Sequence, residues 1–368
     1  MSRPAPLFTP DRIILAKGST STTERRCLAQ AICAAYPDAE VIQATETPHN
    51  RIDLGRPGML DRHQRGKQTL VLAEHQSAVR FSDEAGNGCP NYWHFSPYGF
   101  CPYGCHYCYL AGTSGVRFSP TVKIFLNLPE ILAEIDATAH RLGRPTAFYL
   151  GKLQDGLALD PLTGYTRTMF PFFARHRLAR LTLLTKSAGV SDLCDLEHGG
   201  NCILSWSINP PEVVRKFEQN TPVVEDRIAA MIQCSRAQYP VRAVLMPIIP
   251  VPDWQDIYRR FLHDLLRRVT LSRITLGCIC SYPQALWLTE RKLGPDNAIS
   301  AAVARSCDKD GDGRIRFPVP LREEVYRTLV ATIREAAPGL EIGLCLEEPH
   351  IYKATGLEGS RGRCNCVL

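Results

Sequence analysis

The 368-residue sequence contains no apolar run near the roughly 20 residues that a membrane-spanning helix requires. It also begins without an apolar signal segment, so we expect a cytoplasmic protein in a reducing compartment. Neither sign of charge is in large excess, since a formal net charge of +6 permits an anionic partner without requiring one. The fifteen cysteines are therefore not expected to form a disulfide framework, which is typical of short secreted chains.

Three cysteines form one compact motif. Cys101, Cys105 and Cys108 lie in FSPYGFCPYGCHYCYL with the spacing C-x3-C-x2-C. Three thiolates at this spacing can bind three irons of a [4Fe–4S] cluster and leave the fourth iron open. S-adenosylmethionine (SAM) is the known occupant of such an open iron, and one electron then splits a carbon–sulfur bond of SAM. The motif predicts a radical SAM enzyme with a [4Fe–4S] cluster, SAM and an external one-electron donor such as flavodoxin or ferredoxin.

A zinc site is the alternative that the motif leaves open. Zinc would need a fourth ligand, and His106 is within range in sequence. It lies between two of the cysteines, however, and would force a cramped loop. Most of the other cysteines have no partner at ligand spacing, and we expect them to be small buried hydrophobes.

The chain divides into three parts by pattern. Residues 1–90 are expected to form an N-terminal α/β segment, residues 91–282 a series of βα units, and residues 283–368 a C-terminal extension with a hairpin, a helix, a strand and a cysteine-containing tail. Six βα units predict an α/β fold with a partial (β/α)6 TIM-type barrel of the radical SAM type. The cysteine loop would then lie at the C-terminal ends of the strands, where parallel α/β folds place their active sites.

The expected elements can be stated as ranges. Barrel strands are expected at 92–96, 146–150, 179–186, 202–208, 241–249 and 274–280. Helices are expected at 128–141, 223–236 and 254–268. The N-terminal segment should contain a helix at 25–36 and strands at 40–43 and 68–74, and the C-terminal extension a helix at 322–337 and a strand at 341–346.

The segment Cys307–Pro320 begins like an EF-hand calcium loop. Asp308, Asp310 and Asp312 have the required spacing, but Val319 stands at the twelfth position, where a bidentate Glu belongs. We therefore interpret the segment as the polar turn of a hairpin.

From about residue 60 to 282 the chain resembles the spore photoproduct lyase family, radical SAM enzymes that revert a thymine dimer in spore DNA. The cysteine motif is shared by a whole superfamily, whereas the stretch at 205–222 is far more particular to this family. The matching stretches are GCHYCYL at 104–110, LT at 162–163, LLTK at 183–186, SWSINPPEVVRKFEQNTP at 205–222 and VRAVLMPIIP at 241–250.

The resemblance implies a role for each matching residue. Cys101, Cys105 and Cys108 would hold the cluster. Lys186, Ser207 and Asn209 would surround SAM, with the lysine facing its carboxylate as a point charge. Tyr107 and Tyr109 would contact SAM and pass a hydrogen atom. The alternatives are a solvated strand-end position for Lys186 and simple core packing for Tyr107.

Two departures from the family pattern point away from spore DNA repair. The family's hydrogen-donating cysteine is replaced by Lys152, and an ammonium group cannot donate a hydrogen atom as a thiol can. The family also grips DNA with a basic, aromatic hairpin near residue 310. Here Asp308–Pro320 carries three aspartates, which phosphate would repel.

The C-terminus adds thiols that the family pattern does not explain. Cys364 and Cys366 form a C-x-C motif, and Cys345 is expected on the last strand. Folded over the barrel mouth, these thiols would quench a radical, complete a metal site or hold a thiophilic substrate. The alternative is a disordered tail with idle cysteines. The motif is also loosely similar to that of the radical SAM enzymes that add a 3-amino-3-carboxypropyl group to arsenite in arsinothricin formation.

We therefore expect a small or thiophilic substrate, with arsenite as the candidate, held near Lys152, Cys345, Cys364 and Cys366. The alternative is photoproduct repair in nucleic acid, with Cys364 or Cys366 as the hydrogen donor. A cluster-binding sensor without enzymatic activity would leave the residues expected around SAM without a purpose.

Overall fold

The computed structural model describes residues 8–55, 58–83, 87–304 and 313–368, and it is built around one eight-stranded sheet. The strand order is β17-β14-β13-β11-β10-β9-β5-β4, and all neighbours pair in parallel except β4 with β5. The strands are β4 (Val79–Ser82), β5 (Tyr92–Phe95), β9 (Thr146–Leu150), β10 (Ala179–Thr185), β11 (Cys202–Ser207), β13 (Val241–Leu245), β14 (Arg273–Leu276) and β17 (Glu341–Leu344).

The six predicted barrel strands are confirmed as β5, β9, β10, β11, β13 and β14. Two of them end four residues earlier than predicted, at Leu245 and Leu276. Pro247 has no N–H to offer to a ladder, so β13 cannot continue past it as a paired strand. The residues that follow both strands turn to line a cavity instead, among them Met246 and Cys278.

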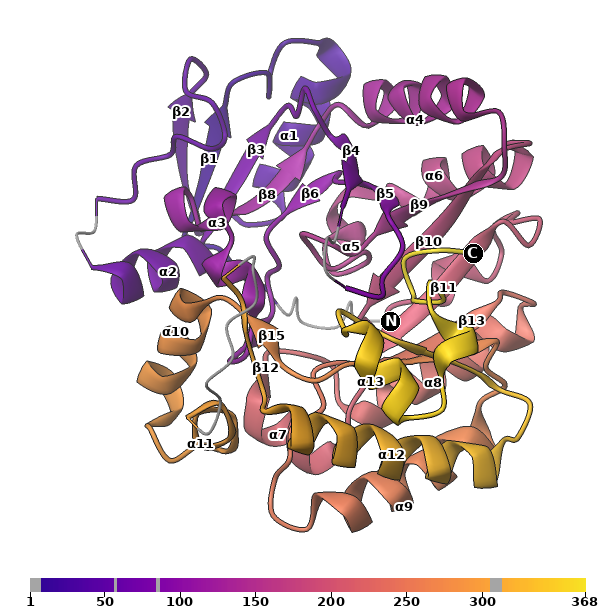
Figure 1. The fold of residues 1–368 in the computed structure, drawn as a ribbon. Coiled ribbons are helices and arrows are strands. Elements are labelled where there is room, and N and C mark those ends of the chain that lie inside the picture. The colour runs from indigo at the N-terminus through magenta and orange to yellow at the C-terminus, as the bar shows by residue number, and fades with distance from the viewer. Residues whose placement is uncertain (1–7, 56–57, 84–86, 305–312) are drawn as a thin grey trace.

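Helices cover the outer side of this curved sheet, as Figure 1 shows. Helix α9 shows the pattern clearly, because its buried residues Trp254, Tyr258, Phe261 and Leu265 recur every three or four positions. The helices connecting the strands are α4 (Leu128–Leu142), α5 (Asp160–Thr163), α6 (Thr166–Arg175), α7 (Pro211–Phe217), α8 (Val224–Arg236), α9 (Trp254–Arg268), α10 (Pro283–Leu293), α11 (Ala298–Val303) and α12 (Val319–Ala336).

A second sheet of five strands lies beside the barrel, in the order β2-β1-β3-β8-β6. It contains β1 (Arg12–Ala16), β2 (Glu40–Ala44), β3 (Thr69–Ala73), β6 (Tyr98–Gly99) and β8 (Val122–Phe125), with helices α1 (Thr23–Ala34) and α2 (Met59–Lys67). The strands β6 and β8 follow residue 90 in the chain but pair within this N-terminal sheet. The predicted domain boundary at residue 90 therefore does not coincide with the boundary between the two sheets.

The C-terminal extension returns to the barrel. Its strand β17 pairs in parallel with β14, and α12 packs against α9. Helix α12 begins earlier than predicted, at Val319, because Pro320 is favourable in a first helical turn. Helix α13 (Pro349–Ala354) and a short 3₁₀ turn (Glu358–Ser360) lead into the tail.

The predicted hairpin around residue 310 is present only in part. Strand β16 (Ile315–Arg316) pairs antiparallel with β15 (Cys280–Ser281), but α10 and α11 separate the two strands in sequence. Asp308, Asp310 and Asp312 lie outside the described residues. Within the described ranges, no helix is long and apolar enough to cross a membrane.

Candidate functional site

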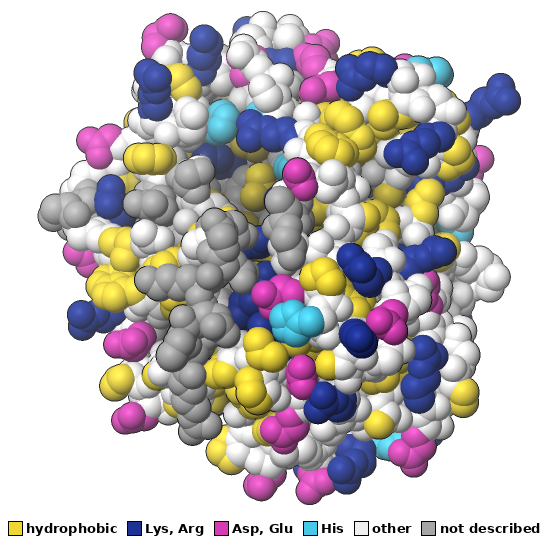
Figure 2. Space-filling view, in the orientation of Figure 1, with side chains coloured by type: hydrophobic (Ala, Val, Ile, Leu, Met, Phe, Trp, Pro, Cys, Tyr) yellow, Lys and Arg dark blue, Asp and Glu magenta, His cyan; other side chains and the backbone are white. Residues whose placement is uncertain are grey.

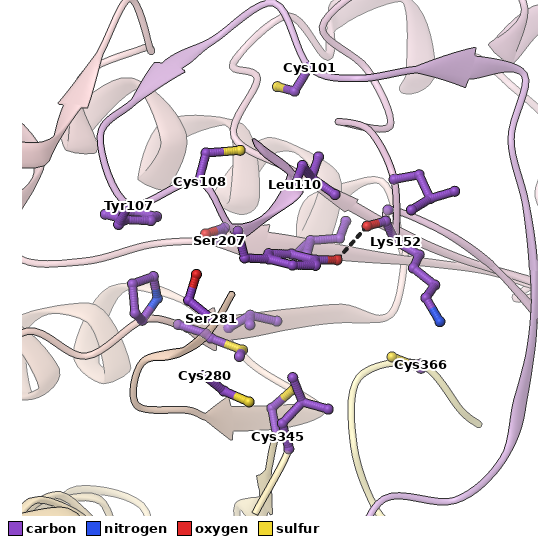
Figure 3. Close-up of a pocket in the computed structure, with 18 of the residues that line it drawn as sticks. Cys101, Tyr107, Cys108, Leu110, Lys152, Ser207, Cys280, Ser281, Cys345 and Cys366 are labelled. Atoms are coloured by element: carbon purple, nitrogen blue, oxygen red, sulfur yellow. Dashed lines mark hydrogen bonds between the residues drawn. The ribbon is translucent and has the colours of Figure 1, made fainter. Parts of the chain in front are cut away.

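A cavity of about 490 Å³ lies at the C-terminal ends of the barrel strands. It is lined by groups from the cysteine loop, the strand ends and the C-terminal tail. Figure 3 shows Cys101 and Cys108 on one side of it and Cys345 and Cys366 on the other, with Lys152 between them. The structure therefore brings the cysteine motif and the C-terminal cysteines into one cavity.

All three motif cysteines face this cavity, and each is partly exposed. Burial raises the pKa of the Cys101 and Cys105 thiols, so thiolates at these positions require positive charge nearby. Lys67 supplies part of it, since its ammonium donates to the carbonyl oxygens of Cys101 and of Tyr103, the latter at 2.7 Å. Three thiols that line one cavity and need a cation to become thiolates fit a three-thiolate iron–sulfur site.

His106 does not complete a zinc site. Its side chain is buried and is not among the groups that line the cavity, and its carbonyl oxygen accepts a hydrogen bond from Thr289 of α10 at 2.8 Å. The backbone around it is fixed by the short strand β7 (Gly104–Cys105), which pairs antiparallel with β12 (Glu218–Gln219). The cluster loop is thus attached to the stretch at 205–222 that carried the family resemblance.

A buried ion-pair network connects that stretch to the cavity. The Glu218 carboxylate lies 2.7 Å from the Arg227 guanidinium and 3.7 Å from the Lys186 ammonium, and it accepts a hydrogen bond from the Tyr107 hydroxyl. Burial lowers the pKa of Lys186, but negative charge at Cys105 and Glu218 outweighs burial and raises it above its ordinary value. Lys186 is therefore a charged group on the cavity wall, not a solvated strand-end lysine.

The two tyrosines beside Cys108 have different surroundings. Tyr107 is buried, with the Lys186 ammonium 5.2 Å from its ring centroid and 3.1 Å from its hydroxyl. Tyr109 lines the cavity, and its hydroxyl donates to the Lys152 carbonyl oxygen at 2.6 Å, the dashed line in Figure 3. Tyr109 is thus the tyrosine that connects the cysteine loop to Lys152.

Ser207 and Asn209 also differ. Ser207 lines the cavity, whereas Asn209 does not. The Asn209 amide is fully buried; it donates to the Pro247 carbonyl at 3.1 Å and accepts from the Tyr258 hydroxyl at 3.0 Å. In this structure Asn209 shapes the end of β13 and is separated from the cavity.

Asp155 is a cavity residue that the sequence did not reveal. Its carboxylate accepts from the backbone N–H of Leu157, Ala158 and Lys186 and from the Thr185 hydroxyl, at 2.6 to 3.0 Å. These bonds fix the loop after β9 against the end of β10, and so position Lys152 and Lys186. The run QDG resembles many turns, so no sequence signal distinguished it.

The C-terminal tail lies inside the curve of the barrel and is ordered. Arg273 on β14 donates to the carbonyl oxygens of Cys364 at 2.8 Å and Val367 at 3.2 Å, and Arg242 on β13 donates to that of Val367 at 2.6 Å. Gly343 on β17 leaves room for the tail, because a Cβ there would lie 1.9 Å from the Arg363 carbonyl oxygen. The tail is therefore a built part of the cavity wall.

Four thiols converge where the tail meets the cavity. Cys345, Cys364 and Cys366 all line it, and Cys89 joins them from the segment before β5. Cys364 lies within hydrogen-bonding distance of Cys366 and of Cys89, and Cys89 within the same distance of Cys345. Cys89 stands in no spacing motif, so only the fold could reveal it.

Comparison with known proteins gives one consistent result. The family profile described as Spore photoproduct lyase matches residues 8–277. The spore photoproduct lyase of Bacillus subtilis (strain 168) is 28% identical over 222 residues, 60% of this chain and 63% of the relative. That of Geobacillus sp. (strain Y412MC61) is 29% identical over 243 residues, 63% of this chain and 68% of the relative. The matched region thus spans less than two thirds of the Bacillus protein.

Solved structures agree on the fold. A spore photoproduct lyase complexed with dinucleoside spore photoproduct superposes with a TM-score of 0.79 at 22% identity, covering 92% of this chain and 99% of the other. A mutant with bound AdoMet and the same dinucleoside gives a TM-score of 0.78 over 91% and 98% of the two chains. The predicted radical SAM fold is confirmed.

Proposed function

Since this chain belongs to the spore photoproduct lyase family, whose members are radical SAM enzymes with a [4Fe–4S] cluster, we propose that it catalyses a lyase reaction on a nucleic-acid lesion of dinucleotide size. The bound cluster supplies one electron that breaks a carbon–sulfur bond of SAM and starts radical chemistry on the substrate. Every further role proposed below belongs to side chains of this protein.

A dinucleotide-sized substrate suits the cavity as well as the family. On the face shown in Figure 2, Lys and Arg side chains are interspersed with Asp and Glu side chains. The cavity itself has a volume of about 490 Å³ and is lined by Tyr92, Tyr103, Tyr107, Tyr109 and Tyr149. Aromatic faces of this kind stack on bases without reading sequence.

The single observation that carries the proposal is the position of the tail thiols. Lys152 stands where the family's donor cysteine was expected, and Cys366 lies close enough to Lys152 to feel its charge. Contact with Cys364 lowers the pKa of Cys366, but burial together with the neighbouring thiols Cys345 and Cys89 outweighs this and raises it above its ordinary value. The Cys366 sulfur therefore keeps its hydrogen at neutral pH, and we assign it the return of a hydrogen atom to the substrate radical.

The opposite wall binds SAM in this proposal. Lys186 faces the SAM carboxylate as a charged group held by Glu218, and Ser207 offers a hydroxyl beside it. Tyr109 separates SAM from the substrate and shares the hydrogen-atom path, while Tyr107 holds Lys186 in position. Water exclusion follows from the tail, which closes the barrel interior behind the substrate.

A second candidate rests on the same thiols. Cys345, Cys364 and Cys366 are three soft ligands on one wall, the donor set that arsenite prefers, so a 3-amino-3-carboxypropyl transfer to a thiol-bound arsenite is the competing reaction. The family match favours the lyase reaction. The two differ in which carbon–sulfur bond of SAM breaks, and hence in the fragment released.

The experiment uses the anaerobic protein with a reconstituted cluster, a one-electron reductant, SAM and the dinucleoside spore photoproduct. We expect 5′-deoxyadenosine together with repaired dinucleoside. Methylthioadenosine, formed only when arsenite is added, would replace the lyase proposal by the second candidate. Formation of 5′-deoxyadenosine without repair would overturn the proposed substrate class. If neither fragment of SAM forms although the cluster is intact, the proposed reaction is overturned.

A further inference from the structure

The four thiols at the tail form a series of contacting pairs. Contacts join Cys366 to Cys364, Cys364 to Cys89, and Cys89 to Cys345. Among the described residues, three ligand atoms within 4.8 Å of one another occur only at Asp136, His140 and His176. The four sulfurs are therefore spaced as contacting pairs, which suits disulfide exchange better than the coordination of one ion.

Exposure changes along the series. Cys364 and Cys366 are 1% and 9% exposed, whereas Cys89 and Cys345 are partly exposed. The backbone around the series is fixed, since the Leu346 N–H points at the Cys89 sulfur at 3.1 Å and the Gly362 N–H donates to the Gly88 carbonyl at 3.1 Å. The segment before β5 and the tail are thus held against each other, with the buried end of the series at the substrate.

We propose that these residues form a thiol relay in which Cys364 resolves the radical left on Cys366, and Cys89 and Cys345 carry the resulting disulfide to the partly exposed end of the series. This rests on the proposed function, which makes Cys366 the hydrogen donor. No disulfide joins the fourteen described cysteines.

The return of the hydrogen atom balances when the one-electron carrier takes back one electron. The Cys366 S–H bond breaks, its hydrogen atom forms a C–H bond on the substrate radical, and a thiyl radical remains. Cys364 loses its proton and bonds to that sulfur, and one electron passes back to the oxidised one-electron carrier that began the turnover. The product is a Cys364–Cys366 disulfide, and the dithiol has supplied the two electrons that SAM cleavage consumes.

Exchange then restores the donor. The Cys89 thiolate attacks the Cys364 sulfur and releases Cys366, and the Cys345 thiolate attacks Cys89 and releases Cys364. A Cys89–Cys345 disulfide remains, at the partly exposed end of the series, where an external dithiol reduces it. One side chain at each step is oxidised as its neighbour is reduced, so no further oxidant is needed.

The first test counts thiols. In a single anaerobic turnover without added dithiol, we expect two thiols to disappear for each 5′-deoxyadenosine formed, with a Cys89–Cys345 or Cys364–Cys366 disulfide in the peptide map. An unchanged thiol count beside normal 5′-deoxyadenosine formation would overturn the relay. Absence of 5′-deoxyadenosine would instead overturn the proposed function.

The second test separates the steps, and its final part does not depend on the cluster. With dithiothreitol present, Cys89→Ser should complete one turnover per enzyme and then stop, because its Cys364–Cys366 disulfide cannot pass on, whereas Cys27→Ser, an exposed thiol on α1, should behave as the unaltered protein. Sustained turnover by Cys89→Ser would overturn the relay. In cluster-free protein equilibrated with dithiothreitol redox buffers, we expect these four cysteines to oxidise before the others; random pairing would contradict the proposal.

Discussion

Replacing Glu218 by Gln is expected to destabilise the protein and weaken SAM binding together. The side chains of Glu218 and Arg227 have no solvent exposure, and that of Lys186 is 13% exposed. Glutamine keeps the shape and can still bond the Tyr107 hydroxyl, but it removes the carboxylate charge that Lys186 and Arg227 share. The substitution therefore isolates charge from packing.

The magnitude follows from the burial. Breaking a buried ion pair by removing one partner costs about 3–5 kcal/mol, because the remaining charge is left without compensation. The matched control is Glu225→Gln on α8, whose carboxylate pairs with Arg268 at 2.8 Å but is 65% exposed, so it should cost about 0–1 kcal/mol. Urea unfolding at pH 7 measures both free energies of unfolding.

The same substitution has a pH signature. Burial raises the pKa of Glu218, but Lys186 and Arg227 outweigh burial and hold it below its ordinary value. A carboxyl group with a depressed folded pKa contributes stability above its unfolded pKa and loses it as the pH falls through the folded value. The gap between Glu218→Gln and the unaltered protein should therefore close in acid. A cost below that of the control, or a gap that persists in acid, would refute the reasoning.

Four further predictions concern single side chains. Cys105→Ala should lower iron content after reconstitution to background by iron assay, while far-ultraviolet circular dichroism stays unchanged. Lys186→Met should raise the SAM Kd, measured calorimetrically, by about tenfold or more, the loss of one charge-assisted contact. Burial lowers the pKa of Lys123 from 10.5 to about 7, so between these pH values the unfolded chain binds more protons than the folded chain. The free energy of unfolding, measured with urea, should therefore rise with pH in this window. Lys123→Met should flatten that rise. Gly343→Ala should displace the tail and expose Cys364 to thiol reagents, because the new Cβ meets the Arg363 carbonyl.

Much of the fold could be predicted because its signals are local. Helix α4, for example, has Pro129 in its first turn and ends at Gly143 with φ of 64°, so residue types that favour helix ends mark both of its boundaries. The early end of β13 was missed, although Pro247 was visible. The pairing of β8 with the N-terminal sheet was also missed, since a short apolar strand does not specify its partner.

The cysteine motif could be predicted because three ligands within eight residues must face one point. The tail could be suspected but not placed, since its anchors, Arg242 and Arg273, lie more than ninety residues away in the chain. Those two arginines inside apolar strands were a signal, as a buried guanidinium needs acceptors from elsewhere. The position of Cys89 could not be predicted, because its thiol partners, Cys345 and Cys364, are distant in the sequence.

The most direct test of the central claim is the deuterium content of the repaired dinucleoside formed in D₂O. Thiol hydrogens exchange with solvent, so a product that receives its hydrogen from Cys366 should carry one deuterium, and Cys366→Ser should form 5′-deoxyadenosine without releasing that labelled product. A repaired product without deuterium, or one labelled equally by Cys366→Ser, would contradict the account.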